Sequence, residues 1–236
     1  MKVVGFEQLS RADLEVANIY EGGLGGILAG EPISKVLSGA GNQGGIRIAG
    51  RVGARKFVVL FTTLIDQDWP DDLDSRTAKL VYYGDNKVPG RELHDTAPGG
   101  NLLFKEVFAD LHSVESRRHL IPPFFLFSRS KTEESGRSVE FQGLCVPGYP
   151  GVSEMDDLVA VWKTKDGQRY QNYRAIFSIL NIPLVSRKWI TDIAEGNSSS
   201  AHAPTAWLDW VELGKHDLLV RSTRDIGDVS DKAGNR

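Results

Sequence analysis

The apolar residues of this chain occur in short runs, and most runs have the length and composition of β-strands. Lys56–Thr63 (KFVVLFTT) and Pro122–Ser128 (PPFFLFS) are continuous apolar runs rich in β-branched and aromatic residues, which is typical of buried strands. Shorter or alternating runs predict further strands at Val3–Phe6, Lys79–Tyr83, Ser138–Pro147, Leu158–Thr164 and Arg169–Ile179. The last two flank the turn signal Asp166-Gly167 and are expected to form a hairpin.

Helical periodicity occurs in the middle of the chain and near both ends. Gly100–His112 has apolar residues at positions 102, 103, 107, 108 and 111, which predicts an amphipathic helix. Other expected helices are a capped turn or helix over Ser10–Ala17, a helix from the N-cap Ser186 to Ala194 that Gly196 ends, and a short helix over Thr205–Leu213. Because the strand connections are short or hairpin-like, we predict an α+β fold, a curved, mostly antiparallel β-sheet or barrel with flanking helices.

The composition is that of an ordinary globular protein. The chain has 236 residues, of which 41% are hydrophobic and 25% charged, enough for one large domain or a domain with an appendage. No apolar run approaches the ~18 residues of a membrane span, and the start has no signal-peptide core, so we expect a cytoplasmic protein. Cys145 is the single cysteine, which excludes an internal disulfide and a cysteine-based zinc site.

Charge modifies this picture only locally. The net charge is −3, so bulk charge does not indicate a nucleic-acid binder. Residues 41–131, however, carry 13 basic and 11 acidic residues, which allows a basic patch there. The glycine-rich start of this segment, GNQGGIRIAG (41–50), either cradles phosphate through backbone N–H groups or forms turns that need positive φ.

Lys79–Thr96 (KLVYYGDNKVPGRELHDT) has a mixture of residues that hydrophobic patterning does not require. Two tyrosines end the predicted strand, and the following loop carries acidic, amide and basic side chains. The loop after the preceding buried strand supplies Asp66, Asp68, Trp69 and Asp71. If the two strands pair, their aromatic rings flank a slot with a carboxylate at its base. Such a slot suits a flat base, since stacking contributes roughly 1–3 kcal/mol per base and a carboxylate accepts from cytosine N4.

Two other interpretations remain open. A metal-dependent nuclease or hydrolase would use His94, Asp95 and a distant His112 or His119, although HExxH, GxSxG and HNH-type motifs are absent from the sequence. A protein-interaction domain would dock a partner through Trp207 and Trp210, which lie three residues apart on one helical face. Packing of these tryptophans onto the domain's own sheet explains the same spacing.

Several separated motifs resemble one known family. They are GNQGGIR (41–47), DWPD (68–71), YYGDNKVPGRELHDT (82–96) followed by GGN, PPFF (122–125) and RYQNYRA (169–175). Together they resemble the N-terminal domain of AspBHI-type modification-dependent restriction endonucleases, a divergent SRA-like (SET and RING-associated) module. The resemblance implies an SRA-like or PUA-like curved β-barrel that recognises 5-methylcytosine in duplex DNA by flipping the base out of the stack.

The resemblance also implies roles for individual residues. The base pocket is expected to contain Asp66, Asp68, Trp69, Asp71, Tyr82, Tyr83 and Gly84. Tyr82 is the expected stacking ring, Asp68 the favoured acid, and Trp69 the opposing aromatic. The expected DNA-contacting residues are Arg47, Asp85, Asn86, Lys87, Arg91, His94, Gln171, Asn172 and Arg174. Lys87, Arg91 and Arg174 would hold the backbone, and Gln171 or Asn172 would touch the groove or fill the gap left by the flipped base.

We expect three segments: an N-terminal arm or helical extension (1–40), the SRA-like modified-DNA-binding domain (41–215) and a polar tail or linker (216–236). No cofactor, metal, membrane or catalytic centre is expected in this chain. The polar tail SDKAGNR resembles a linker cut partway. This favours a fragment whose C-terminal partner is a nuclease domain, Mrr-like or HNH.

Overall fold

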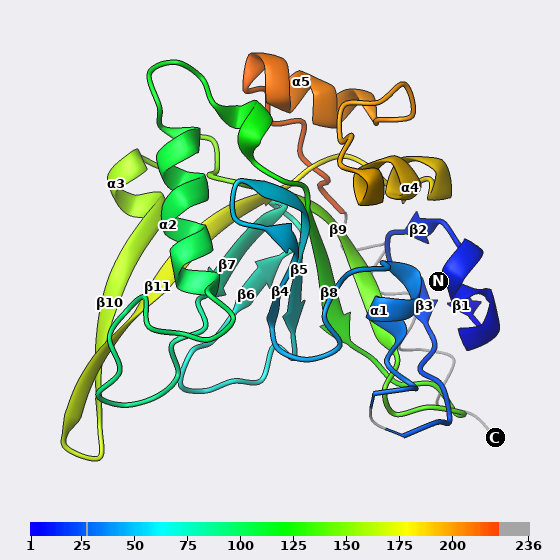
Figure 1. Ribbon diagram of the computed structural model, residues 1–236, viewed down its shortest axis with the longest axis horizontal. Coiled ribbons are helices and arrows are strands. Elements are labelled where there is room, and N and C mark those ends of the chain that lie inside the picture. Colours follow the sequence, from blue (N-terminus) through cyan, green and yellow to red (C-terminus); the bar gives the residue numbers. More distant parts are fainter. Residues whose placement is uncertain (27, 222–236) are drawn as a thin grey trace.

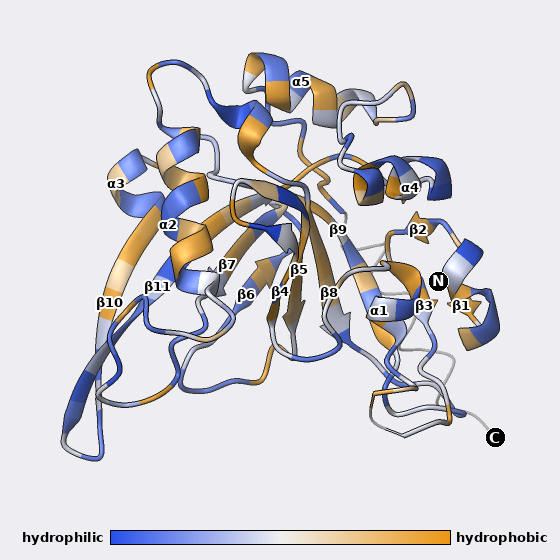
Figure 2. Ribbon diagram, in the orientation of Figure 1, coloured by the Kyte–Doolittle hydropathy of each residue, from blue (hydrophilic) through white to orange (hydrophobic). Residues whose placement is uncertain are grey.

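The most apolar runs form the centre of one ten-stranded sheet, and shorter or more polar strands lie at its margins (Figure 1). This computed structural model describes residues 1–26 and 28–221. Figure 2 shows mostly hydrophobic central strands and mostly hydrophilic loops. The strands are β1 Val3–Val4, β2 Leu14–Glu15, β3 Ile19–Tyr20, β4 Ile46–Arg51, β5 Ala54–Thr62, β6 Asp72–Asp74, β7 Lys79–Tyr83, β8 Phe124–Arg129, β9 Val139–Pro147, β10 Leu158–Lys165, β11 Gln168–Ile179 and β12 Leu184–Val185.

The main path of the sheet has the order β4-β5-β8-β9-β11-β7-β6. Pairs β5–β8 and β1–β3 are parallel, and the other pairs of described strands are antiparallel. The long strand β11 pairs with β10 over its first half and with β7 and β9 over its second half. The predicted β10–β11 hairpin is confirmed, with Asp166 and Gly167 at positive φ in its turn, and it extends past the sheet as an arm (Figure 1).

The expected barrel is wrong in one respect, because the sheet curls but does not close. Its end strands β4 and β6 do not pair with each other among the described residues. β6 is three residues long and carries Asp72 and Asp74, and charged side chains on so short an edge disfavour a further strand. The curled sheet therefore has an open seam, where the ends of β5 and β7 face each other without a ladder of backbone hydrogen bonds.

Helices lie along one side and one end of the sheet. They are the 3₁₀-helices η1 Phe6–Arg11 and η2 Arg118–Leu120, and the α-helices α1 Pro32–Val36, α2 Gly100–Leu111, α3 Glu154–Asp157, α4 Arg187–Glu195 and α5 Thr205–Leu213. Helix α2 packs Phe104 and Phe108 onto Phe177 of β11, with ring centroids 5.5 and 5.7 Å apart. The predicted ends of α4 are confirmed, because Ser186 accepts the Trp189 N–H (3.2 Å) and Gly196 ends the helix at φ 95°.

The tryptophans of α5 pack inside the domain. Trp207 and Trp210 are 1% and 0% exposed, and the Trp207 ring lies 5.9 Å from Trp189 and 5.5 Å from Trp210. They therefore present no exposed ring to a partner. Among the described residues, no helix combines the length and the apolarity needed to cross a membrane.

Of the capped turn or helix expected over Ser10–Ala17, the helix is not formed. The segment leaves η1 at Arg11 and continues as strand β2, which pairs with β12. Tertiary hydrogen bonds hold it extended. The Tyr20 hydroxyl accepts the Glu15 N–H (2.7 Å) and donates to the Asp13 carbonyl (2.9 Å), and these contacts outweigh the local capping signal.

The first forty residues share the core of the rest of the chain. Strand β3 pairs with β9 of the main sheet, and Leu9, Ile33 and Val36 are fully buried. Arg187 at the start of α4 joins the two parts. Its guanidinium donates to the Ala12 (2.9 Å), Val36 (2.9 Å) and Leu9 (3.0 Å) carbonyls.

We expect Arg187→Lys to lower the free energy of unfolding by about 1.5–3 kcal/mol, because an ammonium cannot reach three carbonyls that a planar guanidinium serves together. Urea denaturation measures this loss. The matched control is Lys188→Ala at the neighbouring exposed position, which should stay within about 0.5 kcal/mol of the parent. Equal effects of the two changes would contradict the role given to Arg187.

Candidate nucleic-acid interface

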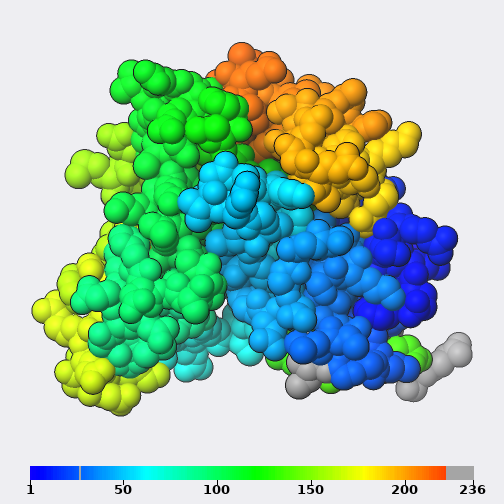
Figure 3. Space-filling view, in the orientation of Figure 1, coloured from blue at the N-terminus to red at the C-terminus, as the bar shows by residue number. Residues whose placement is uncertain are grey.

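A pocket of about 470 Å³ lies at the open seam of the sheet. Figure 3 shows the surface hollowed at the lower edge, between the green loop that follows β7 and the blue segment that leads into β4. Three parts of the chain converge there: the entry to β4, the end of β5 with its following loop, and the end of β7 with its loop. The lining residues are Gly44, Gly45, Ile46, Arg47, Phe61, Thr62, Thr63, Asp66, Asp71, Tyr82, Tyr83, Gly84, Asp85, Lys87 and Pro98.

Asp71 joins the two sides of the seam. One carboxylate oxygen accepts the Thr62 hydroxyl of β5 (2.7 Å), and the other accepts the Tyr83 N–H of β7 (2.9 Å). Burial raises the pKa of Asp71 above its usual value, although these two hydrogen bonds and the nearby Lys87 act in the opposite direction. The pocket therefore holds a desolvated but still partly exposed acceptor.

Asp66 and Lys87 form an ion pair at the rim of the pocket. The Lys87 ammonium lies 2.6 Å from the Asp66 carboxylate, whose other oxygen accepts the N–H groups of Asp68 and Trp69 (3.0 and 3.1 Å). Burial alone would raise the pKa of Asp66, but these hydrogen bonds and the charge of Lys87 outweigh it and lower the pKa. Asp66 is thus charged and paired, whereas Asp71 lies deeper and has no direct cationic partner among the described residues.

Tyr82 forms the inner wall of the pocket. Its hydroxyl donates to the Phe61 carbonyl of β5 (2.9 Å), and its ring meets Phe104 of α2 edge-on at 6.3 Å. Burial raises its pKa well above the ordinary value, so the hydroxyl stays a donor. Tyr82 is 3% exposed, whereas the Phe61 ring is only half-buried and has the Arg47 guanidinium 5.6 Å from its centroid.

Sequence reasoning missed Phe61 as a pocket residue. It belongs to a continuous apolar run, and such a run does not indicate which face of a strand each residue occupies. The change from apolar to hydroxyl residues at Phe61-Thr62-Thr63 was the available signal that the strand leaves the core at this point.

Asp85 caps the central helix. Its carboxylate accepts the Thr96 hydroxyl (2.9 Å) and the backbone N–H groups of Gly100 (2.7 Å) and Asn101 (2.9 Å) at the start of α2. A carboxylate at a helix N-terminus satisfies N–H groups that have no partner within the helix. Asp85 lines the pocket, but its oxygens are engaged by the helix, so we expect it to position the loop.

Asn86, Asn101 and Asn172 hold the loop between β7 and α2, and each is 0% exposed. Asn86 donates to the carbonyls of Arg91, Glu92 and Gln171, and Asn101 donates to that of Leu93. Asn172 donates to Gly84 and accepts the Asn86 N–H. The structure therefore gives Asn86 and Asn172 a scaffolding position, and neither side chain can reach DNA without leaving it.

Asp68 and Trp69 lie outside the pocket. Asp68 pairs with Lys163 (2.8 Å) and Lys165 (3.0 Å) of β10, and the hydrogen bonds from these lysines lower its pKa to about 2. Trp69 is 3% exposed and packs between Tyr83 and Tyr170, with centroids 5.5 and 5.8 Å apart. The structure thus places the favoured pair, Asp68 and Trp69, outside the pocket lining, whose acids are Asp66, Asp71 and Asp85.

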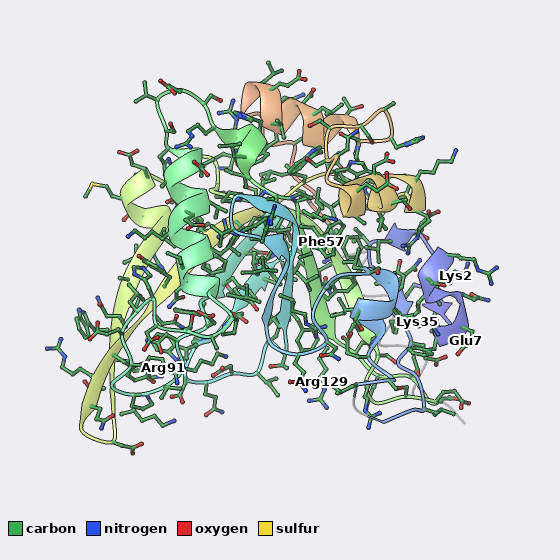
Figure 4. All side chains as sticks on the ribbon, viewed as in Figure 1. Lys2, Glu7, Lys35, Phe57, Arg91 and Arg129 are labelled. Carbon is green, nitrogen blue, oxygen red and sulfur yellow. The ribbon has the colours of Figure 1, made fainter. Side chains whose placement is uncertain are left out.

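The other expected contact residues are distributed around the same edge. Arg47 is 7% exposed and pairs with Glu31 (2.8 Å), and it also donates to Gly41 and Gly44, so it orders the glycine-rich entry to β4. Lys87, Arg91 and His94 are exposed, while Gln171 and Arg174 are half-buried. The Arg174 guanidinium donates to the Asp156 carbonyl (3.2 Å). Figure 4 shows Arg91 on the lower edge of the molecule.

A second hollow of about 270 Å³ adjoins the pocket and shares Arg47, Phe61 and Thr63 with it. Arg129 and Arg137 line it, both exposed and without an ion pair in the part of the chain that the structure describes. Figure 4 shows Arg129 on the same lower edge as Arg91. The first pocket has two cations and three carboxylates in its lining, whereas the second has three arginines and Glu31.

The arrangement required by a metal-dependent hydrolase is not found around His94. Its ring lies 3.2 Å from the Tyr173 hydroxyl, and within residues 1–26 and 28–221 no group of three or more His, Cys, Asp or Glu side chains is placed to hold a metal ion. His112 instead contacts Asp157 at 2.8 Å, beside α3.

Comparisons with known proteins agree with the resemblance seen in the sequence. The family model described as "Restriction endonuclease AspBHI N-terminal" matches residues 14–222. The DNA recognition domain of the cytosine modification-dependent restriction endonuclease LpnPI is 45% identical, with a TM-score of 0.87, over 94% of this chain and 97% of that one. The DNA modification-dependent restriction endonuclease AspBHI is 39% identical, with a TM-score of 0.85, over 93% and 100%.

A more distant structure shares the fold alone. MspJI restriction endonuclease, solved in complex with a 27-mer oligonucleotide, is 19% identical, with a TM-score of 0.61, over 89% of this chain and 55% of that one. The comparison with curated proteins gives no match.

Gly84 offers a test of the loop scaffold. A Cβ there would lie 1.7 Å from Asn101 Oδ1 and 2.6 Å from Asn172 Oδ1, so we expect Gly84→Ala to lower the free energy of unfolding by about 1–3 kcal/mol. Gly136→Ala is the matched control, since a Cβ there has no neighbour within 4 Å. Chemical denaturation of both variants decides the point, and an unaffected Gly84→Ala would show that the asparagines are not fixed as described.

Proposed function

Because this chain belongs to the restriction endonuclease AspBHI N-terminal family, we propose that it is the DNA recognition domain of a modification-dependent restriction endonuclease and reads 5-methylcytosine by base flipping. The proposal concerns duplex DNA as the partner. A nuclease domain, Mrr-like or HNH, is the second partner that the assignment implies. The single observation that carries the proposal is the pocket at the seam, which combines aromatic walls with a desolvated carboxylate.

The pocket has the chemistry that a flipped cytosine needs. Its volume of about 470 Å³ falls within the roughly 300–1,000 Å³ of small-ligand sites. Phe61, Tyr82 and Tyr83 supply aromatic surface, and Asp71 supplies an acceptor for the exocyclic N4 amine. The sequence left Asp66, Asp68 and Asp71 as candidates for this acceptor and favoured Asp68. We now assign the role to Asp71, because it is the acid that joins the two walls.

The cost of flipping a base and the free energy that the pocket can return are of comparable size. Extruding a base from a duplex costs a few kcal/mol, and stacking on one aromatic ring returns about 1–3 kcal/mol. A hydrogen bond to a charged acceptor contributes about 1.5–3 kcal/mol. Stacking and the Asp71 hydrogen bond together therefore offset the cost, and losing either one should abolish flipping.

The two hollows differ in charge, which indicates which one receives the base and which one receives the DNA backbone. A neutral base suits the acidic pocket, whereas a phosphate suits the adjoining hollow with Arg129 and Arg137. Lys87 and Arg91 provide exposed cations on the other side of the pocket. We assign these four residues to the DNA backbone, which adds Arg129 and Arg137 to the set expected from the sequence.

The base contact is tested with Asp71→Asn. The Asn side-chain carbonyl must still accept the Tyr83 N–H, which leaves an amide N–H₂ in place of the second carboxylate oxygen, so affinity for the methylated duplex should fall at least tenfold (about 1.4 kcal/mol or more), toward that for the unmethylated duplex. Kd values of both duplexes at one stated salt concentration measure it. Asp68→Asn, outside the pocket, is the control and should keep the parent's preference. Equal affinity of the parent for both duplexes would refute the proposal.

The pH dependence follows from the direction of the Asp71 shift. Its pKa is raised in the free protein, so on acidification it takes up a proton before an ordinary aspartate does. A protonated carboxyl loses acceptor capacity, and affinity for the methylated duplex should therefore fall as the pH drops through that raised pKa. Asp71→Asn should flatten this part of the profile, measured as Kd against pH.

The backbone contacts are tested by salt titration. Each phosphate contact removed should lower the slope of log K against log[salt] by about 0.9, so we expect Lys87→Ala to reduce it by about one and Arg129→Ala/Arg137→Ala by about two. Both losses should be the same for methylated and unmethylated duplexes. Arg51→Ala/Lys188→Ala removes two exposed cations elsewhere, Arg51 lying at the far end of β4 from the pocket, and should leave the slope unchanged. A slope that the Arg129/Arg137 pair does not alter would place the backbone elsewhere.

A further inference from the structure

Two exposed aliphatic residues lie on the segment that borders the pocket. Leu64 and Ile65 are 44% and 73% exposed, and they lie between Thr63 and Asp66, both of which line the pocket. Figure 2 shows a hydrophobic segment in the β5–β6 connection at the lower edge, among loops that are otherwise mostly hydrophilic. Single exposed aliphatic residues are common on protein surfaces, so it is the position of this pair beside the pocket that matters.

Leu64 is held in an unfavourable backbone conformation. Its φ of 58° places it in the left-handed region, which a branched residue other than glycine seldom adopts. Strain of this kind persists where the surroundings impose it, and it concentrates at functional sites. Asparagine or glycine would fit this backbone more easily, so local conformation does not explain the choice of leucine.

The strained turn is linked to the pocket carboxylate. The Leu64 N–H donates to the Thr62 hydroxyl oxygen (3.0 Å), and the same hydroxyl donates to Asp71 (2.7 Å). Thr62 therefore connects the acceptor proposed for the flipped base with the residue that carries the first exposed side chain. Val88, 44% exposed and next to Lys87, adds an apolar residue on the loop across the pocket.

We propose that Leu64 and Ile65 form an apolar wedge that enters the DNA stack where the flipped nucleotide has left it. This inference rests on the proposed function. Apolar side chains inserted at a base step unstack it, and they cover base faces that would otherwise meet water. The wedge thus acts on the duplex, while Asp71 and the aromatic walls act on the extruded base. The role of gap filler passes to Leu64 and Ile65 from Gln171 and Asn172, since Asn172 is fully buried and Gln171 is half-buried.

A wedge and a contact to the flipped base differ in their expected effect on binding. The wedge assists the opening of a paired base, so it matters where opening is costly and little where the target is already unstacked. A 5-methylcytosine opposite an abasic site is such a target. Removing the wedge should weaken binding to the paired target and spare binding to the unpaired one.

The test uses Leu64→Asn/Ile65→Thr. Asparagine tolerates the left-handed conformation and threonine keeps the β-branch, so the loop is retained while the apolar surface is lost. We expect Kd for the paired methylated duplex to rise about tenfold, and Kd for the duplex with an abasic site opposite the 5-methylcytosine to stay within about twofold. Val52→Thr, 72% exposed at the β4–β5 turn away from the pocket, should change neither.

The outcomes separate the two proposals. If the parent prefers methylated duplex but the double variant loses equally on both targets, or loses on neither, the wedge is refuted and the pocket stands. If the parent shows neither a methyl preference nor tighter binding to the abasic-opposed target, base flipping itself is refuted. Selective loss on the paired target, with the parent's methyl preference intact, supports the wedge.

Discussion

The candidate site depends on how one carboxylate joins two strands that share no ladder of backbone hydrogen bonds. Asp71 accepts a hydroxyl from β5 and a backbone N–H from β7 at the place where the curled sheet remains open. The Tyr82 hydroxyl makes a second bridge across the same seam. These bonds keep the walls of the pocket at a fixed separation without the backbone ladder that would fill it.

The loop after β7 is organised by buried polar groups. Its polar composition therefore marked the site correctly, but several of its polar residues hold the loop and do not face a ligand. Asn86 and Asp85 of the loop, with Asn101 of α2 and Asn172 of β11, bond backbone groups that would otherwise be buried without partners, which carries a large penalty. The side chains left exposed on it include the cations Lys87 and Arg91 and also His94, Glu92 and Asp95. The same short segment therefore contains a rigid inner scaffold and an outer surface available to DNA.

Acidic, basic and aliphatic residues occupy different parts of the surface around the seam. Carboxylates line the hollow assigned to a neutral base, and arginines line the adjoining hollow assigned to phosphate. Exposed aliphatic residues follow Thr63, which lines both hollows, on a strained turn that Thr62 links to Asp71 by hydrogen bonds. The strands position the side chains of the pocket, whereas the loops carry the exposed side chains proposed to contact DNA.

The sequence by itself determined most of the longer elements and the family. Long apolar runs, the Asp166-Gly167 turn, the Ser186 cap and Gly196 act locally, so the strands, the hairpin and helix α4 were predictable, and the separated motifs indicated the AspBHI-type family.

Only the tertiary structure decided which residues share the pocket. Asp71 and Asp68 look alike in the sequence, but one faces the seam and the other pairs with β10, because strand register sets which side chains converge. Phe61 was hidden within a uniform apolar run, and the burial of Asn86 and Asn172 depends on partners up to 88 positions apart. Contacts over such separations follow from the packing of the whole chain, which local patterns do not encode.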